Sequence, residues 1–107
     1  MPFDVYDRSL ELVAQLVAPA EALARRDGDL ARQLRRAASS VTLNIAEGRK
    51  RIGRDQGHLW RIAAGSAEEV RACLQLAAAW GHVPAAQLAT PLATLDRVLA
   101  MLYRLTH

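Results

Sequence analysis

The chain has 107 residues and a formal net charge of +3, a length that fits one domain with a buried core and excludes a second module. Ala and Leu are abundant while Gly, Pro and aromatic residues are few, so the composition favours an all-α fold. The lone Cys73 excludes an internal disulfide, and the lack of a long uncharged apolar run predicts neither a signal peptide nor a membrane span, which favours a cytoplasmic protein.

The first expected helix spans about residues 4–26 and carries two apolar stripes. One stripe begins at Tyr6 and advances by steps of four and three, and the second contains Leu12. Two stripes exceed what a single core face needs. Pro19 lies inside this pattern and is expected to kink the helix or weaken one turn, because it has no amide proton. Residues 26–29 then predict a helix stop, a turn and a new N-cap.

The second expected helix spans about residues 30–49. Its core stripe follows helical spacing and consists of Leu30, Leu34, Ala37, Val41, Ile45 and Gly48. The opposite side of this helix mixes charge with apolar surface, because Leu43 lies there among arginines. After it, the run GRKRIGRD is expected to form a flexible basic loop.

The third helix is expected at about residues 55–80, with Asp55 as its cap. Its expected core face consists of Leu59, Ile62, Ala63, Ser66, Val70, Cys73, Leu74, Ala77 and Trp80. The fourth helix is expected at about residues 84–106, with a bend near Pro91. Its apolar repeat consists of Leu88, Leu92, Leu95, Leu99 and Leu102. Trp60 and Trp80 are expected to be core or interface anchors.

Helices of about 20 residues joined by short turns pack most simply as an antiparallel up-down four-helix bundle. We expect this single domain to cover residues 1–107. The surplus apolar stripes and the position of Leu43 predict burial against other subunits, with Leu43 in the oligomer interface. The sequence therefore predicts a homo-oligomer.

Positive charge is concentrated in residues 32–61, which are net +6 by count, whereas residues 1–24 are net −3. This asymmetry indicates one basic surface, which attracts a polyanion such as nucleic acid. The aromatic residues are too few and too scattered for a base-stacking platform, so little sequence preference is expected. The alternative interpretation is that these cations are only solvated. The candidate nucleic-acid-binding residues are Arg32, Arg35, Arg36, Arg49, Lys50, Arg51, Arg54 and Arg61.

A polar strip borders the core stripe of the second helix and consists of Ser40, Asn44, Glu47 and Arg51. Its members can hydrogen-bond along the helix, and Glu47 can pair with Lys50 or Arg51. No second acid, base or metal ligand lies near them in the sequence. A structural role for Ser40, Asn44 and Glu47 in a helix or subunit contact is therefore favoured over direct ligand recognition.

Two enzyme-like patterns are weak. Arg51 and His58 match the Arg-x(4 to 6)-His pattern of HEPN-type helical endoribonucleases, but arginine is so common here that a chance match is expected. The histidines are far apart in the sequence and no Glu-x-x-His pair occurs, so the sequence predicts no metal centre and no cofactor. We expect a non-enzymatic protein without catalytic residues.

The segment LRRAASSVTLNIAEGRKR resembles a family of small four-helix-bundle proteins, first noticed as products of intervening sequences within bacterial large-subunit ribosomal RNA genes. The resemblance is carried by residues 34–37, Ser40 and residues 44–48, and by an I-A-x-G-S-x-x-E pattern within residues 59–77. Thr42 stands where the family usually has Pro. The resemblance implies an antiparallel bundle that often assembles as a ring-like homopentamer.

The same family includes the accessory variability determinants of diversity-generating retroelements, which are basic bundles that bind nucleic acid and a reverse transcriptase. The resemblance therefore implies a possible adaptor role toward a reverse transcriptase or another RNA-handling protein. Together with the basic segment, it leads us to expect an oligomeric bundle that binds RNA or DNA electrostatically. The contrasting hypothesis is a protein-only assembly module, and a HEPN-like ribonuclease comes third.

Overall fold

The computed structural model describes residues 4–107, which form four α-helices and one short 3-10 helix. The helices are α1 (Asp4–Ala24), α2 (Gly28–Arg49), α3 (Gly53–Ala79), the 3-10 helix η1 (Ala85–Leu88) and α4 (Ala89–Thr106). No strand occurs in this part of the chain, so the all-α prediction is confirmed. Residues 1–3, which the expected domain includes, lie outside the described residues.

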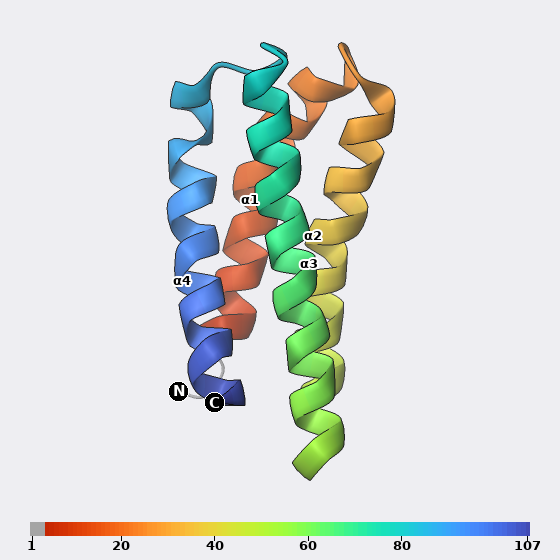
Figure 1. Ribbon diagram of the computed structural model, residues 1–107, viewed down its shortest axis with the longest axis vertical. Helices are drawn as coiled ribbons and strands as arrows, with labels where there is room; N and C mark the ends of the chain where they lie inside the picture. The colour runs from red at the N-terminus through yellow and green to blue at the C-terminus, as the bar shows by residue number, and fades with distance from the viewer. Residues whose placement is uncertain (1–3) are drawn as a thin grey trace.

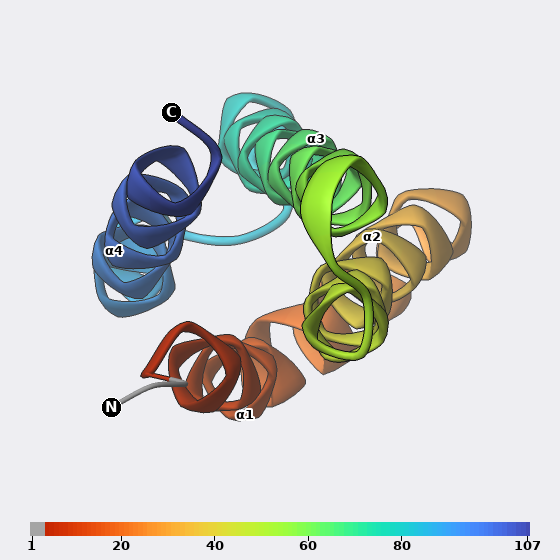
Figure 2. The same cartoon turned by 90° about the horizontal axis from the view of Figure 1, so that it is seen from below.

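The four long helices run antiparallel to their neighbours around one core (Figures 1 and 2). α1 packs against α2, α2 against α3, α3 against α4, and α4 returns to α1. α3 has 27 residues, whereas α4 has 18. The α2–α3 hairpin therefore extends past the start of α1 and the end of α4 at one end of the molecule (Figure 1).

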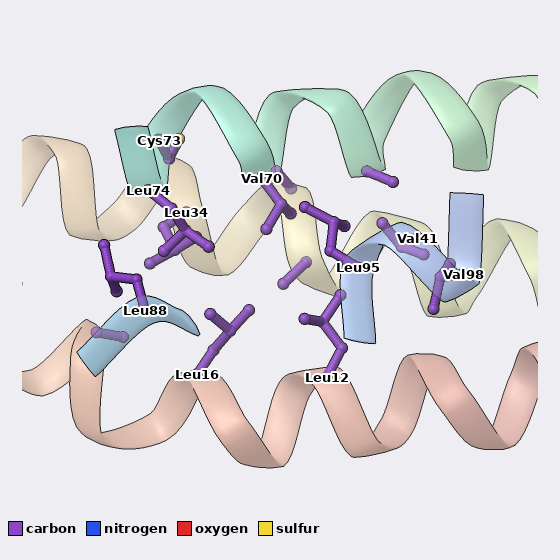
Figure 3. Packing of buried hydrophobic residues seen from close by; sticks show 14 of the residues in the cluster. Leu12, Leu16, Leu34, Val41, Val70, Cys73, Leu74, Leu88, Leu95 and Val98 are labelled. Atoms are coloured by element: carbon purple, nitrogen blue, oxygen red, sulfur yellow. The ribbon is translucent and has the colours of Figure 1, made fainter. Parts of the chain in front are cut away.

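Side chains from all four helices meet in the bundle interior (Figure 3). The predicted core stripe of α2 is confirmed, because every one of its six members is buried. In α1 the stripe that contains Leu12 is buried, whereas Leu10 and Val17 of the other stripe are exposed. Cys73 is buried as expected, and burial raises the pKa of its thiol.

The predicted core face of α3 is wrong at several positions. Trp60 and Ala67 are buried, whereas Ile62 is 40% exposed and Trp80 is 70% exposed. The face turns toward Trp60 because α2 offers this indole a place opposite a glycine, as described below. Trp80 lies at the C-terminal cap of α3, beyond the part of the helix that its neighbours cover.

Helix boundaries differ from the predicted ones where turns intervene. Asp27 is the N-cap of α2, and its Oδ1 accepts a hydrogen bond from the Leu30 amide at 3.0 Å. Asp55 does not cap α3, because that helix already begins at Gly53 and Asp55 lies in its first turn. The expected fourth helix divides into η1 and α4.

The two helical prolines are accommodated within α1 and α4. Pro91 lies in the first turn of α4, where a missing amide proton costs no helical hydrogen bond, and the helix breaks before it at the η1–α4 junction. α1 continues through the buried Pro19. Within residues 4–107, no helix is both long enough and apolar enough to cross a membrane.

Candidate nucleic-acid interface

The α2–α3 hairpin ends in a short turn, residues 49–54, which we call the hairpin tip. Only residues 50–52 of it lie outside a helix, so the predicted flexible loop GRKRIGRD is wrong in its extent. Gly53 has a φ of +60°, a backbone conformation that favours glycine, and it allows α3 to begin directly after the turn. The turn is closed by hydrogen bonds from the Lys50 amide to the Glu47 carbonyl, 3.1 Å, and from the Arg51 amide to the Gly48 carbonyl, 3.0 Å.

Two side chains of α3 hold the tip against the end of α2. The Trp60 indole lies so close to Gly48 that an added Cβ there would be 2.6 Å from Nε1, and Nε1 donates to the Ile45 carbonyl at 3.2 Å. Gln56 Nε2 donates to the carbonyls of Gly48, 3.2 Å, and Arg51, 2.9 Å. These bonds use acceptors that the end of a helix leaves without intrahelical partners. The tip is thus held in a defined shape.

The hairpin tip carries four exposed cations, Arg49, Lys50, Arg51 and Arg54. Arg51 is hydrogen-bonded to Glu47, with its Nη2 at 2.7 Å and its Nε at 3.2 Å from Oε2. This hydrogen bond raises the pKa of Arg51 and lowers the pKa of Glu47. Glu47 and Asp55 are the carboxylates on and beside the tip in the sequence, so the cations outnumber them two to one.

The other predicted cations lie away from the tip. Arg32 pairs with Asp29 at 2.6 Å in the first turns of α2, and Arg35 lines a groove between α1 and α2. At about 1.5 Å per residue, Arg36 is roughly 20 Å from Arg49 along the helix axis. The eight residues are therefore divided along the molecule, and Arg61 on α3 lies nearer the tip.

Polar contacts join α2 to both of its neighbours. The hydroxyls of Ser40 and Ser66 are 2.7 Å apart across the α2–α3 contact, and Asn44 Nδ2 donates to the Ser40 carbonyl, 2.9 Å, and hydroxyl, 3.0 Å. On the other side, Thr42 Oγ1 donates to the buried Ser9 hydroxyl at 2.9 Å. Sequence reasoning missed Ser9, and it assigned Ser66 to an apolar face. A serine at a core position of a helix was the available signal for both.

A shallow apolar groove follows the outer contact of α1 and α2. It consists of two adjoining hollows of about 250 and 280 Å³, which share Val13 and Ser39. Leu43 lines one hollow and is 66% exposed, so no other part of residues 4–107 covers it. Leu10 and Val17 are exposed along the same groove.

The enzyme-like patterns acquire no further members in the structure. His58 is exposed on α3, while the Arg51 guanidinium is engaged by Glu47. Among the residues that the structure describes, no three His, Cys, Asp or Glu side chains are grouped so that they could hold a metal ion.

A family model described as "23S rRNA-intervening sequence protein" matches residues 1–104. A crystal structure of a protein of unknown function from the S23 ribosomal protein family of Bacteroides thetaiotaomicron is similar in fold, with a TM-score of 0.88. The two chains are 22% identical, and the similarity covers 95% of this chain and 97% of the other. None of the curated proteins matches this sequence.

Proposed function

The chain belongs to the family of 23S rRNA-intervening sequence proteins, and from this membership and the hairpin tip we propose that it is a non-enzymatic homo-oligomer that binds RNA or DNA electrostatically. The resemblance in the sequence is thereby confirmed at the level of the family. Binding of nucleic acid, assembly and any adaptor role are our proposals.

The observation that carries the proposal is the projecting, cation-rich hairpin tip. Arg49, Lys50, Arg51 and Arg54 are exposed at the end of the bundle that extends past α1 and α4 (Figure 1). A phosphate backbone can therefore approach them without meeting the rest of the bundle. Contacts of this kind release condensed counterions and carry no sequence information, so we expect little sequence preference.

Assembly is proposed through the α1–α2 groove. Leu10, Val17 and Leu43 present apolar surface there, which a second copy would remove from water. Five subunits in a ring is the state that the family resemblance favours. Each ring would carry several hairpin tips, so binding to a long strand would gain avidity without a stronger single site.

An adaptor role is the further part of the proposal. A ring that binds nucleic acid by its tips could hold a reverse transcriptase or another RNA-handling protein on the same strand, in the cytoplasm. The second candidate function is a protein-only assembly module, which the exposed apolar groove favours.

The experiment that separates these functions neutralises the tip. The triple substitution Arg49→Gln, Lys50→Gln and Arg51→Gln should weaken binding to unrelated RNA and DNA oligonucleotides alike. It should also flatten the dependence of log affinity on log salt by roughly two to three units. The mass of the assembly and the melting temperature should stay unchanged.

The matched control removes the same charge elsewhere, with Arg25→Gln, Arg26→Gln and Arg97→Gln, all of which are exposed and lie outside the tip. We expect this variant to bind more tightly than the tip variant. Equal losses in both variants would show that only net charge matters and would remove the tip as the site.

A further inference from the structure

A second groove lies between α3 and α4, at the same end of the bundle as the hairpin tip. It has a volume of about 430 Å³, which is within the range of small-ligand sites. Since α4 ends where α3 begins, its last turns face the first turns of α3 (Figure 2). The residues that matter are Arg61, Gly65 and Glu68 on one wall, and Tyr103, Thr106 and His107 on the other.

The α4 wall presents a stacked pair of rings. The ring centroids of Tyr103 and His107 are 3.9 Å apart and their planes differ by 18°. His107 Nδ1 lies 3.0 Å from the Tyr103 carbonyl oxygen and 3.1 Å from the Thr106 hydroxyl, which holds the imidazole in this orientation. Tyr103 is still 62% exposed although the imidazole covers one face of its ring. The other face is therefore open to a planar ligand.

The α3 wall presents a cation beside exposed backbone. The Arg61 guanidinium folds toward the hairpin tip over Gly57, where an added Cβ would lie 3.4 Å from Nη1. One turn later, a Cβ on Gly65 would meet nothing within 4 Å, so a ligand can approach the backbone closely. The carboxylate of Glu68, which also borders the groove, lies 3.5 Å from Arg71 Nε and is partly neutralised by it.

We propose that this groove binds single-stranded RNA or DNA, with an unpaired base stacked on Tyr103 and a neighbouring phosphate on Arg61. The inference rests on the proposed function, because the strand would continue from the groove onto the cations of the hairpin tip. Every base has a flat aromatic face, so stacking adds affinity without sequence preference. The faces of duplex bases are already stacked, so the groove discriminates against duplexes.

The fold supplies what the sequence did not predict. Its aromatic residues are scattered along the chain, and no stacking platform was expected. Tyr103 and Arg61 are more than 40 positions apart in the sequence, and the antiparallel packing of α3 and α4 places them on one groove.

The test compares Tyr103→Ala with Tyr103→Phe, using single-stranded RNA, single-stranded DNA and duplex DNA of one sequence. Removing the ring should weaken single-strand binding by about 5- to 150-fold, the usual range for loss of one stacked base, and leave duplex binding unchanged. Tyr103→Phe keeps the ring and should retain single-strand binding. A larger loss for RNA than for DNA would add a 2′-hydroxyl contact to the same site.

Trp80→Ala is the matched control, because Trp80 is the other strongly exposed aromatic of α3 and α4 and lies about 40 Å from the tip along α3. It should leave single-strand binding unchanged. Ultraviolet cross-linking of a bound oligonucleotide gives a second readout, and the cross-linked peptide should contain Tyr103 rather than Trp80.

Equal losses of single-strand and duplex binding in Tyr103→Ala, or no loss in either, would overturn the stacking site and leave the proposed function standing. A change in the mass of the assembly would assign this face to a subunit contact and would also overturn it. Absence of any binding by the wild-type protein would overturn the proposed function itself.

Discussion

At the scale of single residues, the contact of Gly48 with Trp60 decides how α2 and α3 meet. The indole occupies the space where any other residue would carry its Cβ, and it donates a hydrogen bond to the end of α2. The tip with its cations is built directly on this contact. A change at Gly48 therefore acts on stability and on the shape of the tip together.

Gly48→Ala should destabilise the protein. The added Cβ would lie 2.6 and 2.7 Å from two atoms of the buried Trp60 ring, so the ring or α2 must move. Overpacking of this kind costs about 1 to 3 kcal/mol, more than the roughly 1 kcal/mol that alanine gains over glycine in helix propensity. Urea unfolding followed by circular dichroism measures the difference.

Gly65→Ala is the control for this substitution. An added Cβ there meets nothing within 4 Å on an exposed helix face, so the propensity gain stands alone and should stabilise the protein by up to about 1 kcal/mol. Equal effects of the two substitutions would show that the contact between Gly48 and Trp60 is not tight.

At the scale of helices, the hydrophobic period predicted α2 well and α3 poorly. All six residues of the α2 stripe lie on one side at 100° per residue and are buried. In α3, apolar residues occur on several sides, and the period alone selected Ile62 instead of Trp60. A glycine on the facing helix decided the outcome, and such pairing between helices is not visible in the period of one helix. Similarly, the cap at Asp55 was missed because Gly53 starts the helix earlier.

Glu47→Gln should strengthen binding of nucleic acid by the hairpin tip. Glu47 places a negative charge beside the proposed phosphate path and engages Arg51. Gln removes that charge and releases Arg51 for one more phosphate contact, which steepens the salt dependence by roughly 0.7 to 0.9 of a log unit. Electrophoretic mobility shift in a salt series measures this.

Glu21→Gln, on the exposed side of α1, makes the same change of charge outside the tip and should have a smaller effect. The melting temperature of Glu47→Gln should change little, since exposed ion pairs contribute little to stability. Unchanged binding in Glu47→Gln would show that Arg51 takes no part in it.

At the scale of the whole molecule, the sequence predicted the architecture but not the distribution of charge. The bundle follows from helix lengths and short turns, which are local properties. The eight cations are close in sequence, yet α2 carries Arg32, Arg35 and Arg36 away from the tip along its axis. Meanwhile the fold joins Arg61 to Tyr103, which no local pattern could indicate.

Assembly is tested most sharply at Leu43. Leu43→Glu should reduce the mass seen by light scattering to the 11.7 kDa of one chain, whereas Leu43→Ala should remain largely assembled. Leu43 is 66% exposed in the single chain, so glutamate costs the subunit little, but burying its charge in a contact is strongly unfavourable. Circular dichroism controls for folding. A wild-type mass of one chain at micromolar concentration would contradict the oligomer.

The central claim is that the hairpin tip binds phosphate backbones. Its most direct test is the affinity of the wild-type protein for a single-stranded oligonucleotide of about ten nucleotides, within the usual footprint of single-strand sites, across a salt series. Four tip cations predict binding at about 50 mM salt and a slope of log affinity against log salt near −3, at roughly 0.7 per contact. No retardation at about 50 mM salt, or an affinity that does not change with salt, would contradict the claim.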